Sequence, residues 1–439
     1  MKKRGAPLLS MTASLTVAAI LSRVWGFAMR AIMARFIGAE GMGLFQVAGA
    51  YFMGFVIPIT SGLSLATSRL VAKESDRRRT PFTDRVVAVA AAMGLVASTI
   101  SLLLARVIRP GSPEAREAFS PGAVGLMITS STVYAVIEGF FLGSRNAGPL
   151  LFADQILEFT RFILVAVALA HLGAVSIGLR LRWIMVLTAF AETISLAWLA
   201  RRYVATEVLL PRPRSRGGCM PAHRIARDIL KTASPIGLTR LIGSAMRMAE
   251  VSLAPQTLMK TGLGIHESLA AYGQVTGMAI PVVLLPAVIT TSLSLSIVPE
   301  VARCKTAQQA RGRARAASTL AFSLGLLVTW LINRYSDWIA AIFYGSACNP
   351  HILSAVAFLA PPLYVDQVTS SVLRGMGRAD AALVSDLLAW VLRLSLMLTL
   401  PSHPAIGVRG FAIAFVASSA LSALINIAAI FAGGSARRE

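Results

Sequence analysis

Arginines recur inside the apolar stretches of this sequence, and their spacing gives the first functional hypothesis. Arg23 and Arg30 are seven residues apart, as are Arg240 and Arg247, so each pair spans about two helical turns on one face. An arginine at the centre of a membrane span costs roughly 2.5 to 3.5 kcal/mol and persists where it faces a cavity or a partner. Guanidinium groups bind phosphate in bidentate fashion. These four residues, with Arg69 as a further candidate, therefore predict a cavity that binds an anionic, phosphate-bearing substrate.

Two further intramembrane arginines have acidic residues close by in the sequence. Arg161 follows Asp154 and Glu158, and Arg393 follows Asp386. For this pair we expect ion pairs that lock helices together, in preference to contacts with a substrate.

Carboxylates also occur within the apolar stretches, chiefly Glu138, Glu250 and Asp366. Glu250 comes three residues after Arg247, which predicts a pair on one helix face. Two interpretations stay open for the three acids: a proton or Na⁺ coupling site, or charge partners for the arginines.

Pro58 and Pro286 each fall in the middle of a predicted helix. A proline there frees a backbone carbonyl and permits a bend. Both positions are candidate hinges, with simple packing as the alternative.

The elements that must position these residues are membrane-spanning helices. Hydrophobic residues make up 56% of the 439 residues and charged residues 14%, against roughly 25% charged residues in a soluble domain. A spanning barrel would show alternating segments of about ten residues, and the sequence has none. The sequence predicts about twelve spans of about 20 residues or more: 9–34, 42–71, 84–107, 120–142, 149–171, 183–200, 228–258, 268–301, 316–343, 350–373, 380–400 and 407–433.

The net charge of +22 is distributed as in a multispanning protein. Lys and Arg gather in every second loop, for example in 73–85, 201–231 and 303–315, as the positive-inside rule requires. We therefore expect no nucleic-acid partner, a location in the cytoplasmic membrane, and both termini on the cytoplasmic side.

Catalytic and metal-binding patterns are missing from the sequence. It has no Walker-type loop and no His/Cys metal spacing, and Cys219, Cys304 and Cys348 form an odd set without a disulfide pattern. The charged start followed by an apolar run has no convincing cleavage site and is interpreted as an uncleaved first helix. The sequence thus predicts a transporter, with no enzymatic activity, no metal and no cofactor.

The two halves of the sequence resemble each other. SRVWGFAMR from Ser22 and TRLIGSAMR from Thr239 share five of nine residues, and two weaker matches follow in the same order. Such a repeat predicts an N-terminal six-helix lobe over 1–200, a basic cytoplasmic linker over 201–227 and a C-terminal six-helix lobe over 228–439. Since six is even, the two lobes would insert with the same orientation, related by an axis along the membrane normal, and would enclose a cavity suited to alternating access.

Three segments carry a resemblance to a known family: SRVWGFAMRAIMARFIGAEGMGLFQ from Ser22, GLSLATSRLVAKE from Gly62 and SSVLRGMGRAD from Ser370. They resemble the polysaccharide-biosynthesis and stage V sporulation protein B branch of the MOP flippase superfamily, and its lipid II flippases. The resemblance implies a V-shaped pair of six-helix lobes, with Arg23 at the position of a cavity arginine. The next cavity arginine of the flippase pattern falls on Met29, one residue before Arg30. The chain is also expected to lack the two extra C-terminal helices of many relatives.

The sequence therefore predicts an all-α, polytopic membrane protein that acts as an alternating-access flippase. Its expected cargo is an undecaprenyl-pyrophosphate-linked sugar or peptidoglycan precursor, used in cell-wall or spore-cortex synthesis, with membrane lipids and wall-synthesis enzymes as further partners. A cation-coupled multidrug exporter of the same superfamily is the second hypothesis. A non-transporting scaffold for wall synthesis is the third, and it would not need repeated intramembrane charges.

Overall fold

The computed structural model describes residues 6–432 except for a few short segments. Those exceptions are 74–80, 109–115, 118, 145, 174, 209–219 and 305, and side chains are described from residue 20 onward, without 206–208. The Pro-Arg run from Pro211 and Cys219 therefore lie outside the described residues.

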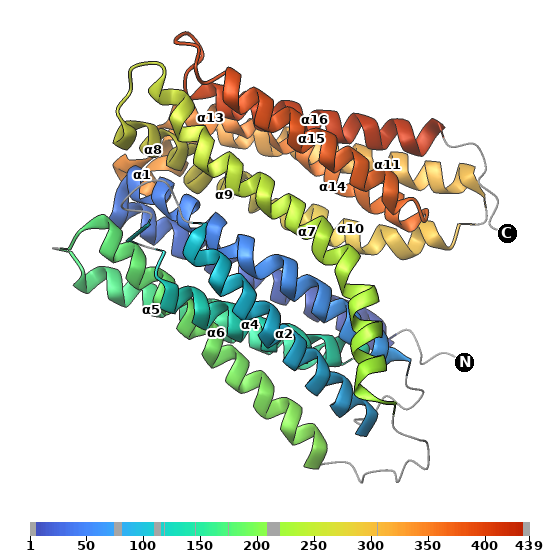
Figure 1. Ribbon diagram of the computed structural model, residues 1–439. Helices are drawn as coiled ribbons and strands as arrows, with labels where there is room; N and C mark the ends of the chain where they lie inside the picture. The colour runs from blue at the N-terminus through green and yellow to red at the C-terminus, as the bar shows by residue number, and fades with distance from the viewer. Residues whose placement is uncertain are drawn as a thin grey trace. The chain divides into compact units, whose positions relative to one another are not determined.

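Regular structure in the described residues is helical throughout, which confirms the predicted all-α class (Figure 1). The helices up to residue 259 are α1 (Ala6–Ala72), α2 (Pro81–Val107), α4 (Pro121–Gly143), α5 (Gly148–His171), α6 (Ile177–Val208) and α7 (Ala222–Met259). The helices after residue 259 are α8 (Ile265–Gly273), the π-helix η1 (Gln274–Ala279), α9 (Ile280–Leu284), α10 (Ala287–Ala302), α11 (Ala307–Arg334), α12 (Ser336–Tyr344), the 3₁₀ turn η2 (Gly345–Ala347), α13 (Pro350–Ala357), α14 (Ala360–Gly375), α15 (Ala379–Thr399) and α16 (Arg409–Ala432).

Membrane spans can be recognised among these helices by length and composition. In the described part of the chain, eight helices meet both criteria, or nine when the bent pair Ile265–Leu284 and Ala287–Ala302 counts as one span. Nine of the twelve predicted segments each fall on one helix to within two residues, whereas 268–301, 316–343 and 350–373 each cross a break between helices. The counts differ because α1 carries two predicted segments, α5 carries three charged residues within one span length, and α7 has a low mean hydropathy.

Gly38 separates the two halves of the long helix α1. Its backbone has φ 68° and ψ −174°, a conformation in which an L side chain would be strained, and it is the point where two helices meet at a kink. The predicted break between residues 34 and 42 coincides with this glycine.

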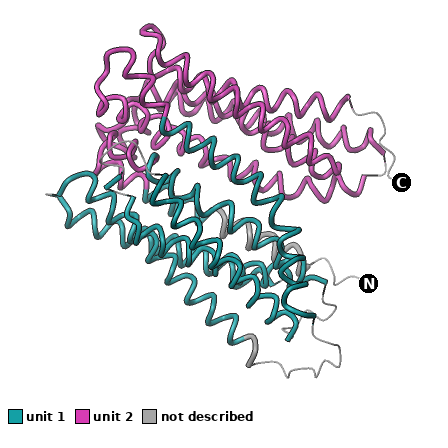
Figure 2. The backbone as a smooth tube through the Cα atoms, in the orientation of Figure 1, with its two compact units in different colours: residues 1–29, 47–252 teal, residues 30–46, 253–439 magenta. Residues whose placement is uncertain are grey.

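The chain forms two compact units, which Figure 2 colours separately. Unit 1 contains residues 1–29 and 47–252, and unit 2 contains 30–46 and 253–439. Compared with the predicted lobes, residues 30–46 belong with the second half, and most of α7 belongs with the first. The predicted lobe boundaries and the internal repeat themselves stay predictions.

Unit 1 is organised around α4, which packs against both α2 and α6, while α5 packs against α6. A core of buried apolar residues joins these helices to α1 and to the start of α7, where Ile225 and Ile229 are fully buried. Proline in the first turn marks the start of α4 and of α5, because its fixed φ suits a helix and its missing N–H is not needed there.

Unit 2 is organised around α14, which packs against α10, α11 and α16. The segment 30–46 approaches α8 at two glycines. An ideal Cβ built on Gly43 would lie 2.1 Å from the Leu269 carbonyl oxygen, and one on Gly273 would lie 2.4 Å from the Gly43 nitrogen. Glycine at both positions is what allows the two backbones to touch.

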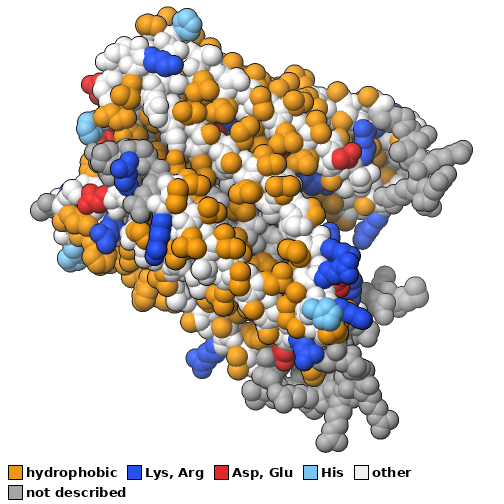
Figure 3. All heavy atoms as spheres, in the orientation of Figure 1, with side chains coloured by type: hydrophobic (Ala, Val, Ile, Leu, Met, Phe, Trp, Pro, Cys, Tyr) orange, Lys and Arg blue, Asp and Glu red, His pale blue; other side chains and the backbone are white. Residues whose placement is uncertain are grey.

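Large apolar side chains cover much of the outer surface of the helices. On α2, Val96, Ile100 and Leu103 are 62%, 54% and 55% exposed, and α11 exposes Leu320 and Trp330 in the same way. Figure 3 shows hydrophobic side chains spread along the helices on one face, with most Lys and Arg side chains toward the helix ends. Many exposed apolar side chains along the helices fit lipid as the surrounding solvent.

Cys348 is buried between α12 and α13, outside the helices that qualify as membrane spans. Burial raises the pKa of its thiol to about 12, so at pH 8 only roughly one thiol in ten thousand is the reactive thiolate. In a Cys219→Ser background we expect Cys304, which is partly exposed, to react with iodoacetamide at least about tenfold faster than Cys348. Peptide mass spectrometry over a time course measures both rates, and equal rates would contradict the burial of Cys348.

Candidate functional site

The five arginines predicted to line a cavity are divided between the two units. Arg23, Arg69, Arg240 and Arg247 belong to unit 1, and Arg30 belongs to unit 2. Arg23 and Arg30 are half-buried, whereas the side chains of Arg69, Arg240 and Arg247 are exposed. Their role in substrate binding remains a prediction.

Arg240 and Arg247 lie on one face in the middle of α7, as their spacing predicts. Both side chains are exposed, and no described residue forms a hydrogen bond or ion pair with either. The ion pairs found among the described residues do not include Arg247 with Glu250, and this pair stays a prediction. Glu250 is 9% exposed and has an interaction within the chain, whereas Arg247 is exposed.

Arg30 reaches a polar region of unit 2 near the π-helix η1. It lies close enough to Tyr344 to interact with it electrostatically, and the Tyr344 hydroxyl donates a 2.9 Å hydrogen bond to the Met278 carbonyl. Gln46 Nε2 donates to the Thr276 carbonyl at 3.0 Å. Two carbonyls of a rare π-helical segment are thus satisfied by side chains, which is how such a strained turn is stabilised.

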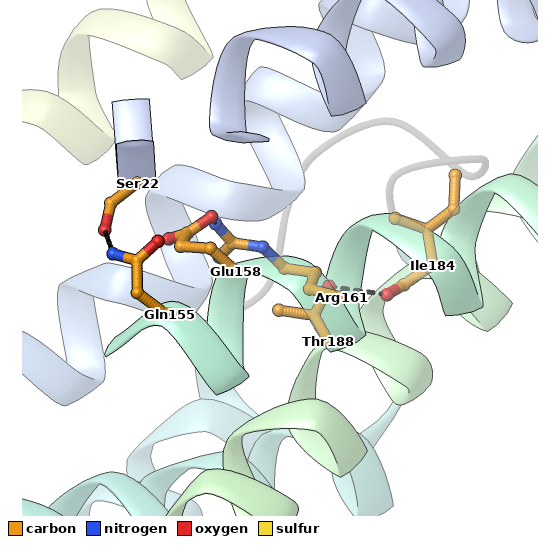
Figure 4. Close-up of polar contacts among 6 residues, drawn as sticks. All are labelled: Ser22, Gln155, Glu158, Arg161, Ile184 and Thr188. Atoms are coloured by element: carbon orange, nitrogen blue, oxygen red, sulfur yellow. Dashed lines mark hydrogen bonds and ion pairs between the residues drawn. The ribbon is translucent and has the colours of Figure 1, made fainter. Parts of the chain in front are cut away.

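An ionised cluster occupies the interior of unit 1 at α5. Arg161 forms an ion pair with Glu158, three residues earlier on the same helix, so an expected ion pair is present, within one helix. One turn before, Gln155 Nε2 donates a 2.6 Å hydrogen bond to the Ser22 hydroxyl, next to Arg23 on α1 (Figure 4). The cluster therefore fixes α5 against the arginine-bearing part of α1.

Partners on α4 and α6 complete this cluster. The Ser131 hydroxyl donates to Glu192, which also lies near Arg161, and the Tyr134 hydroxyl donates to Asp154 Oδ1 at 2.9 Å. Sequence reasoning did not identify Ser131 and Tyr134. The available signal was the polar row on α4 in an otherwise apolar helix.

Asp366 lies at the centre of a second polar network, in unit 2. Its carboxylate accepts hydrogen bonds from the Ser422 hydroxyl at 2.6 Å and from Asn426 Nδ2 at 3.0 Å. Asn426 Oδ1 in turn accepts a bond from Ser385 at 2.6 Å. The network joins α14, α15 and α16 through side chains that are otherwise surrounded by apolar residues.

Arg393 packs against an aromatic ring in the same unit. Its guanidinium carbon lies 5.2 Å from the centroid of Phe415, a cation–π geometry that joins α15 to α16. The ion pair expected between Arg393 and Asp386 stays a prediction.

The two candidate hinge prolines differ in their surroundings. Pro286 precedes α10 at a point where two helices meet at 58°, so the predicted bend is present there. Pro58 lies within α1, which stays helical around it. Next to Pro58, the Ile57 carbonyl accepts a 2.7 Å hydrogen bond from the Ser61 hydroxyl. Movement at either proline stays a prediction.

Metal-ligating side chains do not gather in the part of the chain that the structure describes. No group of three or more His, Cys, Asp or Glu residues there could hold a metal ion. The polar groups that the structure brings together are instead the arginines, the two carboxylate networks and a small pocket that contains Glu138.

Comparison with known proteins gives one family match and several relatives. Residues 8–304 match the family described as Polysaccharide biosynthesis protein. The chain is 25% identical to the stage V sporulation protein B of Bacillus subtilis (strain 168) over 427 residues, which cover 95% of this chain and 82% of that protein.

Solved structures share the fold. A multidrug resistance MATE family transporter of the MOP superfamily, in an inward-facing conformation, matches with a TM-score of 0.67 at 16% identity, covering 95% of this chain and 97% of that one. A MOP superfamily transporter from Pyrococcus furiosus, whose binding pocket is described as having reverse polarity, matches with a TM-score of 0.60 at 16% identity, covering 94% and 95%.

Proposed function

The chain belongs to the polysaccharide biosynthesis protein family, and we propose that it carries an undecaprenyl-pyrophosphate-linked sugar or peptidoglycan precursor across the cytoplasmic membrane by alternating access. Its expected place in the MOP superfamily is confirmed by the family match and the shared fold. Its membrane location is supported by the apolar helices. The distribution of Lys and Arg supports an orientation with both termini in the cytoplasm.

The observation that carries this proposal is the arginine pair on α7. Arg240 and Arg247 place two guanidiniums on one face, both exposed and without an ion-pair partner among the described residues. Two such cations at membrane depth are costly unless a ligand compensates them. A pyrophosphate offers several anionic oxygens that bidentate guanidiniums bind well.

The test uses cells depleted of their own lipid II flippase. The wild-type chain is expected to restore access of an external probe to the precursor at the outer leaflet. An Arg240→Ala, Arg247→Ala double variant should lose at least about tenfold of that rate, since two charge-assisted contacts are removed.

A matched control has the same charge change on the same helix. Arg224 and Arg227 are exposed in the first turns of α7, on the cytoplasmic side of the predicted span, and the Arg224→Ala, Arg227→Ala variant should keep the wild-type rate. If the two double variants behave alike at equal expression, the arginine pair has no role in transport. An Arg23→Ala, Arg240→Ala variant extends the test to α1.

Coupling to a proton or Na⁺ gradient is a second part of the proposal. Glu250, which is nearly buried, and Asp366, held by Ser422 and Asn426, are carboxylates inside spans, and Glu138 is a third candidate. In proteoliposomes, Asp366→Asn should abolish the acceleration of transport by an imposed gradient while leaving downhill movement intact. If the acceleration persists in this variant, Asp366 is structural.

The alternative, a cation-coupled multidrug exporter, is supported by the MATE fold and by the carboxylates of unit 1. Export of a lipophilic cationic dye separates the two functions, because the exposed arginines on α7 would repel such a substrate. Wild-type vesicles that concentrate the dye under a gradient would favour the exporter. A scaffold without transport activity would show neither effect.

A further inference from the structure

A small pocket in unit 1 is separate from the arginine pair on α7 and from the ionised cluster on α5. It is formed by the second half of α1 and the end of α4, and its volume is about 290 Å³. Its lining consists of Thr60, Ser61, Ser64, Leu65, Ser68, Glu138 and Leu142. Four hydroxyls, one carboxylate and two leucines therefore face one small space.

The polar groups of this pocket are mainly hydrogen-bond acceptors. The Thr60 hydroxyl donates to the Val56 carbonyl at 3.1 Å, and the Ser61 hydroxyl donates to the Ile57 carbonyl at 2.7 Å. Their protons are thus used within α1, and their oxygens remain able to accept. Glu138 adds two carboxylate oxygens, accepts a hydrogen bond from the Ser64 hydroxyl, and forms no ion pair with any described residue.

One hydroxyl donor compensates a half-buried carboxylate only in part, so further donors would stabilise Glu138. The volume of the pocket limits which hydrogen-bond donors or cations can fill it. A water molecule occupies about 30 Å³, so a single dehydrated cation would leave most of the pocket empty. About 300 Å³ is the lower end for pockets that hold small organic ligands.

A sugar ring matches both the size and the lining. Its hydroxyls donate hydrogen bonds to carboxylate and hydroxyl oxygens, and its C–H faces pack against apolar side chains such as Leu65 and Leu142. Arg69, a predicted phosphate-binding residue, directly follows Ser68 on α1 and its side chain is exposed. In a pyrophosphate-linked sugar the ring and the phosphates are neighbours, and Arg69 lies one helical turn beyond Leu65, which lines the pocket.

We propose that the pocket between α1 and α4 is a sugar subsite, in which Glu138 and the hydroxyls of Thr60, Ser61, Ser64 and Ser68 accept hydrogen bonds from the first sugar of the lipid-linked substrate. The inference rests on the proposed function, since it names the part of the same substrate that unit 1 recognises. Glu138 then acts in specificity, and its replacement should change which lipid binds more than whether a lipid binds.

The test measures binding of two defined lipids to the full chain in nanodiscs: undecaprenyl pyrophosphate, and the same lipid carrying N-acetylglucosamine. Wild-type protein should bind the sugar-bearing lipid about tenfold more tightly, since hydrogen bonds to a charged group are involved. Glu138→Gln and Thr60→Val, which keep side-chain shape, should each reduce this preference at least about threefold and leave the affinity for the sugar-free lipid unchanged.

Thr99→Val is the matched control. Thr99 is an exposed threonine on α2 whose hydroxyl donates to the Leu95 carbonyl at 2.9 Å, as that of Thr60 does to Val56, and it lies outside the pocket. This variant should keep the wild-type preference. Thermal midpoints of all variants show that each one is folded.

Three outcomes would overturn the proposals in distinguishable ways. If wild-type protein binds neither lipid saturably, the proposed function fails. If it binds both lipids but Glu138→Gln and Thr60→Val keep the wild-type preference, the sugar subsite is wrong and the proposed function stands. If Glu138→Gln keeps the preference and instead removes a dependence of binding on Na⁺, the pocket is a cation site.

Discussion

Replacing Gly43 by alanine is expected to prevent most of the protein from accumulating in a folded form. The added Cβ would lie 2.1 Å from the carbonyl oxygen of Leu269 and 2.9 Å from its carbon. Both are backbone atoms of α8, so no side chain can move aside. Relief requires that segment 30–46 separate from α8, which would also strain the hydrogen bond from Gln46 to Thr276. We expect a destabilisation of about 3 kcal/mol or more.

Gly49 provides the matched control on the same helix. A Cβ at Gly49 meets nothing within 4 Å, so Gly49→Ala should leave stability unchanged or raise it by about 0.5 to 1 kcal/mol through the lower flexibility of the unfolded chain. Fluorescence-detected size-exclusion chromatography after heating gives the thermal midpoint of each variant. Equal midpoints for the two variants would show that the close approach at Gly43 does not exist.

A second large loss of stability is expected from the substitution Arg161→Leu. The Arg161 guanidinium pairs with Glu158 and lies near Glu192, and both partners of the pair have only 18% and 19% of their side-chain surface exposed. Removing the cation leaves a poorly solvated carboxylate without its counter-charge. Breaking such a pair from one side costs about 3 to 5 kcal/mol when it is fully buried, so we expect a loss near the lower figure.

A double variant distinguishes this electrostatic cause from a packing defect. In Glu158→Leu, Arg161→Leu the whole ion pair is replaced by apolar side chains, which is often neutral in a protein interior. The thermal midpoint of the double variant should therefore recover most of the loss seen in Arg161→Leu. A double variant no more stable than the single one would assign the effect to packing.

The two pairs Glu158–Arg161 and Arg247–Glu250 show which side-chain contacts can be predicted from spacing in the sequence and which cannot. In each the two residues are three apart on a helix, which allows the side chains to meet. The first pair forms, whereas in the second Glu250 is buried and Arg247 is exposed. Spacing decides which contacts are allowed, and the packing of the helix in its unit decides which of them occur.

The candidate site likewise contains residues that the sequence identifies and groupings of residues that only the structure shows. The sequence identified Arg23, Arg240 and Arg247 because charge in an apolar stretch is visible without a structure. It did not place Arg30 with unit 2 or join Glu138 to the row of hydroxyls on α1. Those groups are 70 or more positions apart, and no local rule relates them.

The sequence alone determined the positions of the arginines inside apolar segments and the helices that carry them. Lipid as solvent forces long apolar segments into helices whose backbone groups are satisfied internally, so composition and period suffice to find them. Only the tertiary structure decided that residues 30–46 pack with the second half, that Arg161 is neutralised within unit 1 while Arg240 and Arg247 are exposed, and that Glu138 lines a pocket. These outcomes depend on which helix faces become buried against each other, and burial is a property of the assembled units.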